Sequence, residues 1–350
     1  LLGVWIFGWE RISKKLHAAV MWLVAIGGNL SAYWILIANG FMQHPVGFEI
    51  VNDRAQMINF GALLGNPRAI YLFLHTFTSG LVTGAFFVLG FSLYHLVCKH
   101  EVEAFQKTFR LSAIIGLIAT ISAVGTGHAQ AVYLRQVQPM AAAAAEAHYQ
   151  TADPADWSVI ALFDKTGKKV IWDIKIPKAQ SFLYYFKFSG EVEGIDNLQA
   201  KYEEQYGPGD YIPLVALDYW TFRVMVAVGM LMVLLALGAL LVAQKKYPEK
   251  WLARSGWLVW MIVLPYIANT TGWILTETAR QPWVVHGLMQ TSEAISPNVT
   301  TGTVLISLIG FVLIYAVLMG VDLFLLLKFA KAGLPAAATD SVLMQGGRPE

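Results

Sequence analysis

The sequence predicts an all-α membrane protein, a polytopic bundle of transmembrane helices interrupted by one long polar loop. Of its 350 residues, 56% are hydrophobic and only 14% are charged, and the mean hydropathy is +0.53. Apolar segments of about 20 residues, the length that crosses a bilayer, recur along the chain. The single cysteine, Cys98, excludes a disulfide framework and a cysteine metal cluster. The formal net charge of +2 is nearly balanced, which gives no reason to expect nucleic acid as a partner.

The first residues predict the last turns of a helix rather than a signal peptide. The charges at 10–15 follow the apolar run 1–7, no basic segment precedes that run, and no small-residue cleavage site follows it. The chain also lacks an initiator methionine. We therefore expect a partial first helix and a chain truncated at its N-terminus.

Six complete membrane spans are expected after this stub. They are 17–41, 70–97, 111–134, 219–243, 256–276 and 302–327. The partial helix and the first three spans form a region 1–135, and the last three spans form a region 218–330.

The stretch 136–217 between the third and fourth spans is polar. It contains an alanine run at 141–145 and short β-like pieces such as 169–175. A connection of this length is uncommon unless it has a function. The tail 331–350 is polar and rich in small residues, and we expect it to be disordered.

Basic residues gather in the short loops on one side of the predicted bundle. They are Arg11, Lys14, Lys15, Lys99, Lys107, Arg110, Lys245, Lys246, Lys250, Arg254, Lys328 and Lys331. The opposite short loops carry only Arg54, Arg68 and Arg280. By the positive-inside rule, the basic side and the C-terminus are cytoplasmic, and the loop 136–217 is extracytoplasmic.

A carboxylate and a guanidinium close the apolar segment before Pro282. In a helix, Trp273, Glu277 and Arg280 lie on one stripe. Charges at the edge of a bilayer are costly and usually face a cofactor, a partner charge or water. The plain interpretation is an interfacial ion pair at a helix end. The functional interpretations are a site beside a cofactor, or the proton or substrate path of a secondary transporter.

His75 and Met225 lie at matching depths in two different spans. Each is about six residues from the same side of the bundle, or about 9 Å at the rise of an α-helix. A histidine in an apolar helix is more often a packing residue than a ligand. A His/Met pair, however, is an axial ligand set of low-spin haem. Arg223 lies nearby and would pair with a haem propionate or extend to the interface.

Five stretches of the chain resemble the larger, haem-bearing subunit of cytochrome bd quinol oxidases. They are 8–11, 34–43, 71–80, 222–225 and 272–283. They occur in the same order as in that family, and the long loop has the same place. The resemblance implies that His75 and Met225 are the axial ligands of a low-spin haem b, and that Arg223 tunes this haem.

The same resemblance assigns the remaining candidate residues. Glu277 and Arg280, with Trp273, match residues bordering the high-spin haem b and haem d, where oxygen is reduced. The stretch 138–146 matches the quinol-reactive part of the loop, so Gln138 and Glu146 are its candidate quinol-binding residues. The chain departs from the family at Ala141, where a lysine is frequent, and at Ala279, where glycine is usual.

The implied function is that of an electrogenic terminal oxidase in aerobic respiration. Ubiquinol or menaquinol is oxidised, O2 is reduced to water, and charge separation generates proton motive force. Implied partners are a second membrane subunit and a small accessory subunit, in a bacterial or archaeal cell membrane. The family's ligands for the high-spin haems would precede Leu1 and are not in this chain.

Two alternatives remain open from the residues alone. One is the secondary transporter, although no internal repeat or broken helix is evident. The other is an electron-transfer remnant that holds one haem and does not reduce oxygen.

Overall fold

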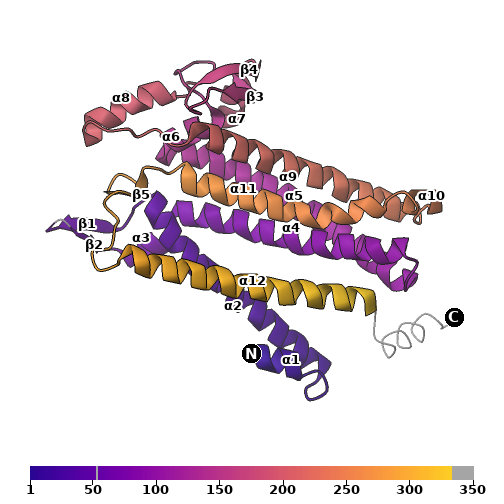
Figure 1. Cartoon of the computed structure of the whole chain (residues 1–350). Helices are drawn as coiled ribbons and strands as arrows, with labels where there is room; N and C mark the ends of the chain where they lie inside the picture. Colours follow the sequence, from indigo (N-terminus) through magenta and orange to yellow (C-terminus); the bar gives the residue numbers. More distant parts are fainter. Residues whose placement is uncertain (53, 333–350) are drawn as a thin grey trace. The chain divides into compact units, whose positions relative to one another are not determined.

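Long helices dominate the computed structural model, which describes residues 1–52 and 54–332 (Figure 1). Six helical segments are long and apolar enough to cross a membrane, which confirms the number of predicted spans. Their helices are α2 (Lys14–Gln43), α3 (Phe60–Leu64) with α4 (Pro67–Val97), α5 (Val102–Val137), α9 (Val215–Gln244), η1 (Gly256–Val263) with α11 (Leu264–Thr278), and α12 (Thr301–Ala332). Two short helices, α1 (Leu2–Phe7) and α10 (Glu249–Leu252), precede and connect spans.

Two of the helices, α2 and α4, begin before the predicted apolar segments because polar residues cap their starts. Ser13 Oγ accepts from Leu16 N at 3.3 Å at the start of α2. Asn66 Oδ1 accepts from Arg68 N at 2.9 Å, and Pro67 occupies the first position of α4, where its fixed φ suits a helix. As a result α4 begins at Pro67 and not near residue 70, so Arg68 is a helix residue and not the loop residue that the sequence suggested.

The fifth span changes helix type, which the sequence did not predict. It begins as the 3₁₀ helix η1 and continues as α11 from Leu264. Pro265 has no N–H to donate to the preceding turn, so the α-helical hydrogen-bond pattern does not extend backwards through it.

The chain forms two compact units. The first comprises Leu1–Gly80, Ile121–Ala227 and Ala268–Glu293, and it contains every candidate site residue. The second comprises Leu81–Thr120, Val228–Ile267 and the residues from Ala294 on. Within the second unit the helices pack closely, since a Cβ added to Gly90 would stand 2.4 Å from Ile262 Cγ1.

The polar stretch between α5 and α9 is folded. It contains α6 (Pro139–Glu146), β3 (Trp157–Phe163), β4 (Val170–Ile176), α7 (Ala179–Tyr185) and α8 (Ile195–Tyr206). The strands β3 and β4 pair antiparallel, with Trp157 opposite Ile176. Figure 1 shows α6, α7, β3 and β4 gathered at the end of α5. The predicted β-like piece is β4, and the alanine run is buried in α6.

The loop has its own hydrophobic core, built on α6 and α8. Its fully buried members include Ala144, Ile195, Leu198, Val215 and Tyr219. Trp283, from β5 (Trp283–Val285), which pairs with β6 (Met289–Gln290), joins this core. A further exposed hairpin, β1 (Phe48–Val51) with β2 (Arg54–Met57), follows α2. Of the tail 331–350, only Lys331 and Ala332 lie among the described residues, as the end of α12.

Candidate functional site

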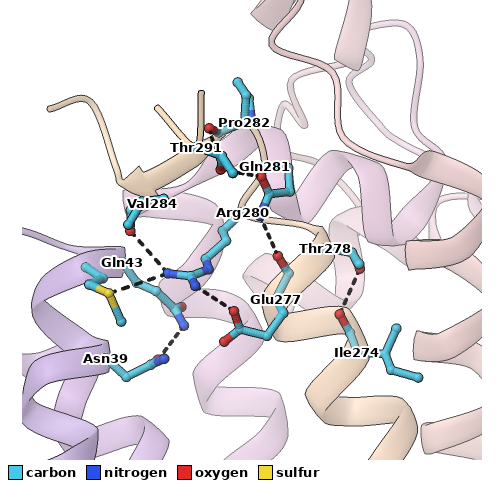
Figure 2. A network of polar contacts seen from close by, with 11 residues as sticks. Asn39, Gln43, Ile274, Glu277, Thr278, Arg280, Gln281, Pro282, Val284 and Thr291 are labelled. Carbon is cyan, nitrogen blue, oxygen red and sulfur yellow. Dashed lines mark hydrogen bonds and ion pairs between the residues drawn. The ribbon is translucent and has the colours of Figure 1, made fainter. Parts of the chain in front are cut away.

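Glu277 and Arg280 form an ion pair at the end of α11. Arg280 Nη2 donates to Glu277 Oε2 at 2.5 Å, with the two side chains 12% and 33% exposed respectively. Arg280 Nη1 donates to Val284 O at 3.1 Å and lies 3.8 Å from Met42 Sδ (Figure 2). The guanidinium is therefore held from three directions. Trp273, expected on the same stripe, has a side chain that is 54% exposed.

A buried polar cluster surrounds Gln43 at the end of α2. Gln43 Nε2 donates to Asn39 Oδ1 at 2.7 Å, and Gln43 Oε1 accepts from Arg68 Nε at 2.7 Å. Gln138 Nε2 donates to Gln43 O at 2.5 Å. Each of these four residues is at most 5% exposed. Gln138, a candidate quinol-binding residue, is thus part of the α2–α4 contact.

His75 is oriented by a carbonyl of the neighbouring helix α5. Its Nδ1 lies 3.1 Å from Ala123 O and 3.3 Å from Thr126 Oγ1. A carbonyl oxygen only accepts, so Nδ1 carries the proton and donates, and Nε2 is left with a free lone pair. This is the tautomer in which a histidine ligates a metal, with its other nitrogen held by a backbone carbonyl. Gly127 supplies room, since a Cβ there would stand 3.0 Å from His75 Cε1.

Met225 lies on α9 and packs against a glycine of α11. A Cβ added to Gly272 would stand 2.7 Å from Met225 Sδ, well inside van der Waals contact. A thioether sulfur and an imidazole nitrogen together form a donor set suited to low-spin haem iron. The residues therefore fit a haem that has one histidine and one methionine ligand.

Arg223 and Glu146, which the sequence analysis assigned to separate roles, form a buried ion pair. Arg223 Nη2 donates to Glu146 Oε2 at 2.6 Å, and each side chain is 9% exposed. Trp157 Nε1 donates to the same carboxylate oxygen at 3.0 Å. Arg223 also donates to Ser158 O from Nη2 at 2.5 Å and stacks over the Tyr219 ring at 4.4 Å. The Glu146 carboxylate at the end of α6 is thereby bound to α9, at a residue two positions before Met225.

The structure brings in two histidines that the sequence analysis did not single out. His286 N donates to Met42 O at 2.8 Å, which holds this loop residue near Arg280. Burial, with a smaller contribution from His44, lowers the pKa of His286 to about 4. Burial also lowers the pKa of His44. Both rings are neutral at pH 7, so the fixed charges close to Gln43 are those of Arg68, Glu277 and Arg280.

Comparisons with known proteins agree on one family. The model of the family described as cytochrome bd terminal oxidase subunit I matches residues 1–334. The chain is 46% identical over 335 residues to the cytochrome bd ubiquinol oxidase subunit 1 of Bacillus subtilis (strain 168), covering 95% of this chain and 71% of that protein. It is 31% identical to the cytochrome bd-II ubiquinol oxidase subunit 1 of Escherichia coli (strain K12), covering 99% and 79%. The structure of the bd oxidase from Geobacillus thermodenitrificans matches with a TM-score of 0.82 at 27% identity, covering 95% of this chain and 74% of that one.

Proposed function

Because the chain belongs to the cytochrome bd terminal oxidase subunit I family, we propose a role for each candidate residue in quinol oxidation or oxygen reduction. Members are multi-pass membrane proteins with haem cofactors that act as terminal quinol oxidases alongside a second subunit. Their substrates are quinol and O2. Neither the secondary transporter nor the single-haem remnant is favoured by this membership.

His75 and Met225 would hold the iron of a low-spin haem b. The observation that carries this assignment is the contact of His75 Nδ1 with Ala123 O, because it directs the lone pair of Nε2 to a ligand. Gly272 leaves the space that the Met225 sulfur occupies. Bound there, the haem would supply one-electron transfer. Arg223, whose charge is balanced by Glu146, would tune this haem through the ion pair that it forms two residues before the methionine.

Quinol would bind along α6, from Gln138 at its start to Glu146 at its end. Glu146 would accept a hydrogen bond or a proton from a quinol hydroxyl, with its carboxylate oriented by Trp157 and Arg223. Ubiquinol and menaquinol both suit this chemistry. The loop 136–217 would face the extracytoplasmic side and the C-terminus the cytoplasm, as the distribution of lysine and arginine indicates.

Glu277 would serve the oxygen-reducing centre, with Trp273 beside it. Arg280 holds the Glu277 carboxylate in one orientation, which suits a group that receives and passes on protons. High-spin haem b and haem d would lie at this centre. Protons would come from the cytoplasmic side, so that turnover generates proton motive force. The proposal also divides the chain into transmembrane regions 1–135 and 218–330, the quinol-binding loop 136–217 and the tail 331–350. A small accessory subunit would complete the assembly.

The reduced-minus-oxidised spectrum of the complete oxidase tests the ligand assignment. Met225→Leu conserves side-chain volume but removes the sulfur, so it should abolish the low-spin signal while the protein still assembles. Met232→Leu, a buried methionine on the same helix, is the control and should keep the signal. A low-spin spectrum unchanged in Met225→Leu would refute the assignment.

A further inference from the structure

Arg68 is a buried cation in a membrane-spanning segment. It lies in the first turn of α4, and only 2% of its surface is exposed. Its side-chain acceptor is the neutral amide oxygen of Gln43, to which Nε donates at 2.7 Å and Nη2 also donates. Nη1 is buried and has no hydrogen-bond partner within the described part of the chain. One amide oxygen thus serves a group with five N–H donors.

No carboxylate lies within 4 Å of the Arg68 guanidinium among the residues that the structure describes. The contrast is with Arg223, the other arginine in these ranges that is at least nine-tenths buried, because Arg223 has Glu146 as its counter-ion. A buried charge without a counter-charge is strongly unfavourable. The guanidinium therefore requires an anion that residues 1–52 and 54–332 do not supply.

Arg68 shares a helix face with His75. The two residues are seven positions apart, which is two turns of α4 or about 10 Å along its axis. The anions closest to a histidine-ligated haem are the propionates at the edge of its macrocycle. A guanidinium recognises a carboxylate by two parallel N–H···O bonds, and the unpartnered Nη1 of Arg68 offers donors for such a contact.

We propose that Arg68 binds a propionate of the haem held by His75 and Met225, as a positioning residue that stabilises the reduced haem. This inference rests on the ligand assignment above. It also separates the roles of the two buried arginines. Arg223 is neutralised by Glu146, whereas the charge of Arg68 is neutralised when the cofactor is bound.

The test uses the complete oxidase carrying Arg68→Gln, with haem labelled with ¹³C at its propionates. Reduced-minus-oxidised infrared spectra report the labelled carboxylate band, and a redox titration reports the midpoint potential of the low-spin haem. In Arg68→Gln the labelled band should shift, and the reduction equilibrium should fall at least tenfold, or about 59 mV for one electron. Arg54→Gln, the same charge change at an exposed strand residue, should alter neither.

Arg68→Lys is the second test variant, used if the oxidase carrying Arg68→Gln does not assemble. It keeps the charge but loses the planar fork, so the labelled band should still shift while the potential changes less than in Arg68→Gln. An unchanged propionate band in either assembled variant overturns the proposal. So does a potential shift that delipidation of the wild-type enzyme reproduces, because the anion would then be a lipid phosphate.

Different experimental results refute the role of Arg68 and the assignment of His75 and Met225 as haem ligands. If Met225→Leu keeps its low-spin spectrum, the haem is not held where we place it and both fail. If Met225→Leu loses the spectrum but the propionate band of Arg68→Gln is that of the wild type, only the role of Arg68 is refuted.

Discussion

Arg223 on α9 donates to Glu146 at the end of α6 at 2.6 Å, although 77 residues separate them in the chain. The pair fixes the loop to the span that carries Met225. Displacing Glu146 would free a buried guanidinium next to the proposed haem ligand. A change at the proposed quinol site therefore alters the electrostatic environment of the methionine.

Glu146→Gln should destabilise the protein and raise the midpoint potential of the low-spin haem. Removing one partner of a buried pair costs about 3–5 kcal/mol, because the other charge is left uncompensated. The uncompensated Arg223 would also favour the reduced haem. Thermal denaturation and redox titration measure the two effects. The double variant Glu146→Gln/Arg223→Gln should recover part of the lost stability, and equal melting temperatures for the wild type and Glu146→Gln would contradict the prediction.

Gly272→Ala should weaken the low-spin signal without any change to the ligands themselves. The added methyl group would stand 2.7 Å from Met225 Sδ, and overpacking of this kind costs about 1–3 kcal/mol. The methionine would move away to relieve the contact. Gly310→Ala, where the added atom meets no described residue within 4 Å, is the matched control for the spectrum. A normal low-spin signal in Gly272→Ala would argue against Met225 as ligand.

Glu277→Gln should leave the low-spin spectrum in place and reduce oxygen consumption roughly 100-fold, the lower end of what a positioned proton-transfer group contributes. The amide keeps the size of the side chain but removes its proton-accepting charge. Glu293→Gln, a change at an exposed residue of the same unit, should leave oxygen consumption at the wild-type rate. Equal damage to both haem signals in Glu277→Gln would show that the two centres do not divide the work in this way.

The protein should lose stability as the pH falls from about 6.5 to about 4. The pKa of His286 is lowered to about 4 by burial, and an unfolded histidine titrates near 6.5. In this window the unfolded chain binds a proton that the folded protein excludes, so stability rises with pH by up to about 1.4 kcal/mol per unit. Melting temperatures measured across this range should show a shallower slope in His286→Gln. The slope should not vanish, because the pKa of His44 is lowered in the same direction.

The spans could be predicted because each is a long apolar run, and length and hydropathy are local properties. The residues at which helices begin and end are harder to predict. The apolar core of the second span begins near residue 70, but Asn66 and Pro67 start the helix earlier and carry Arg68 into it. The Asn-Pro pair is itself a helix-start signal that is present in the sequence. The 3₁₀ start of the fifth span depends on one proline and carries no hydropathy signal.

Residue type, depth in the membrane and family resemblance identify the candidate residues. They do not identify the groups that these residues contact. The contact of Gln138 with Gln43 O joins residues that are 95 positions apart, and that of His75 with Ala123 O joins residues 48 apart. Such pairings are set by how the helices pack. A single sequence shows which side chains can donate, accept or ligate. The fold determines which of them contact one another.

The alanine run of α6 bears on any attempt to convert this loop to the more common family pattern. Ala141, where the family frequently has lysine, is only 4% exposed, and its neighbours in the helix are buried as well. A lysine placed there by a single substitution would have to fit its ammonium group among the buried side chains around α6. Introducing a lysine at this position would therefore require changes in the residues packed against α6 as well as at Ala141.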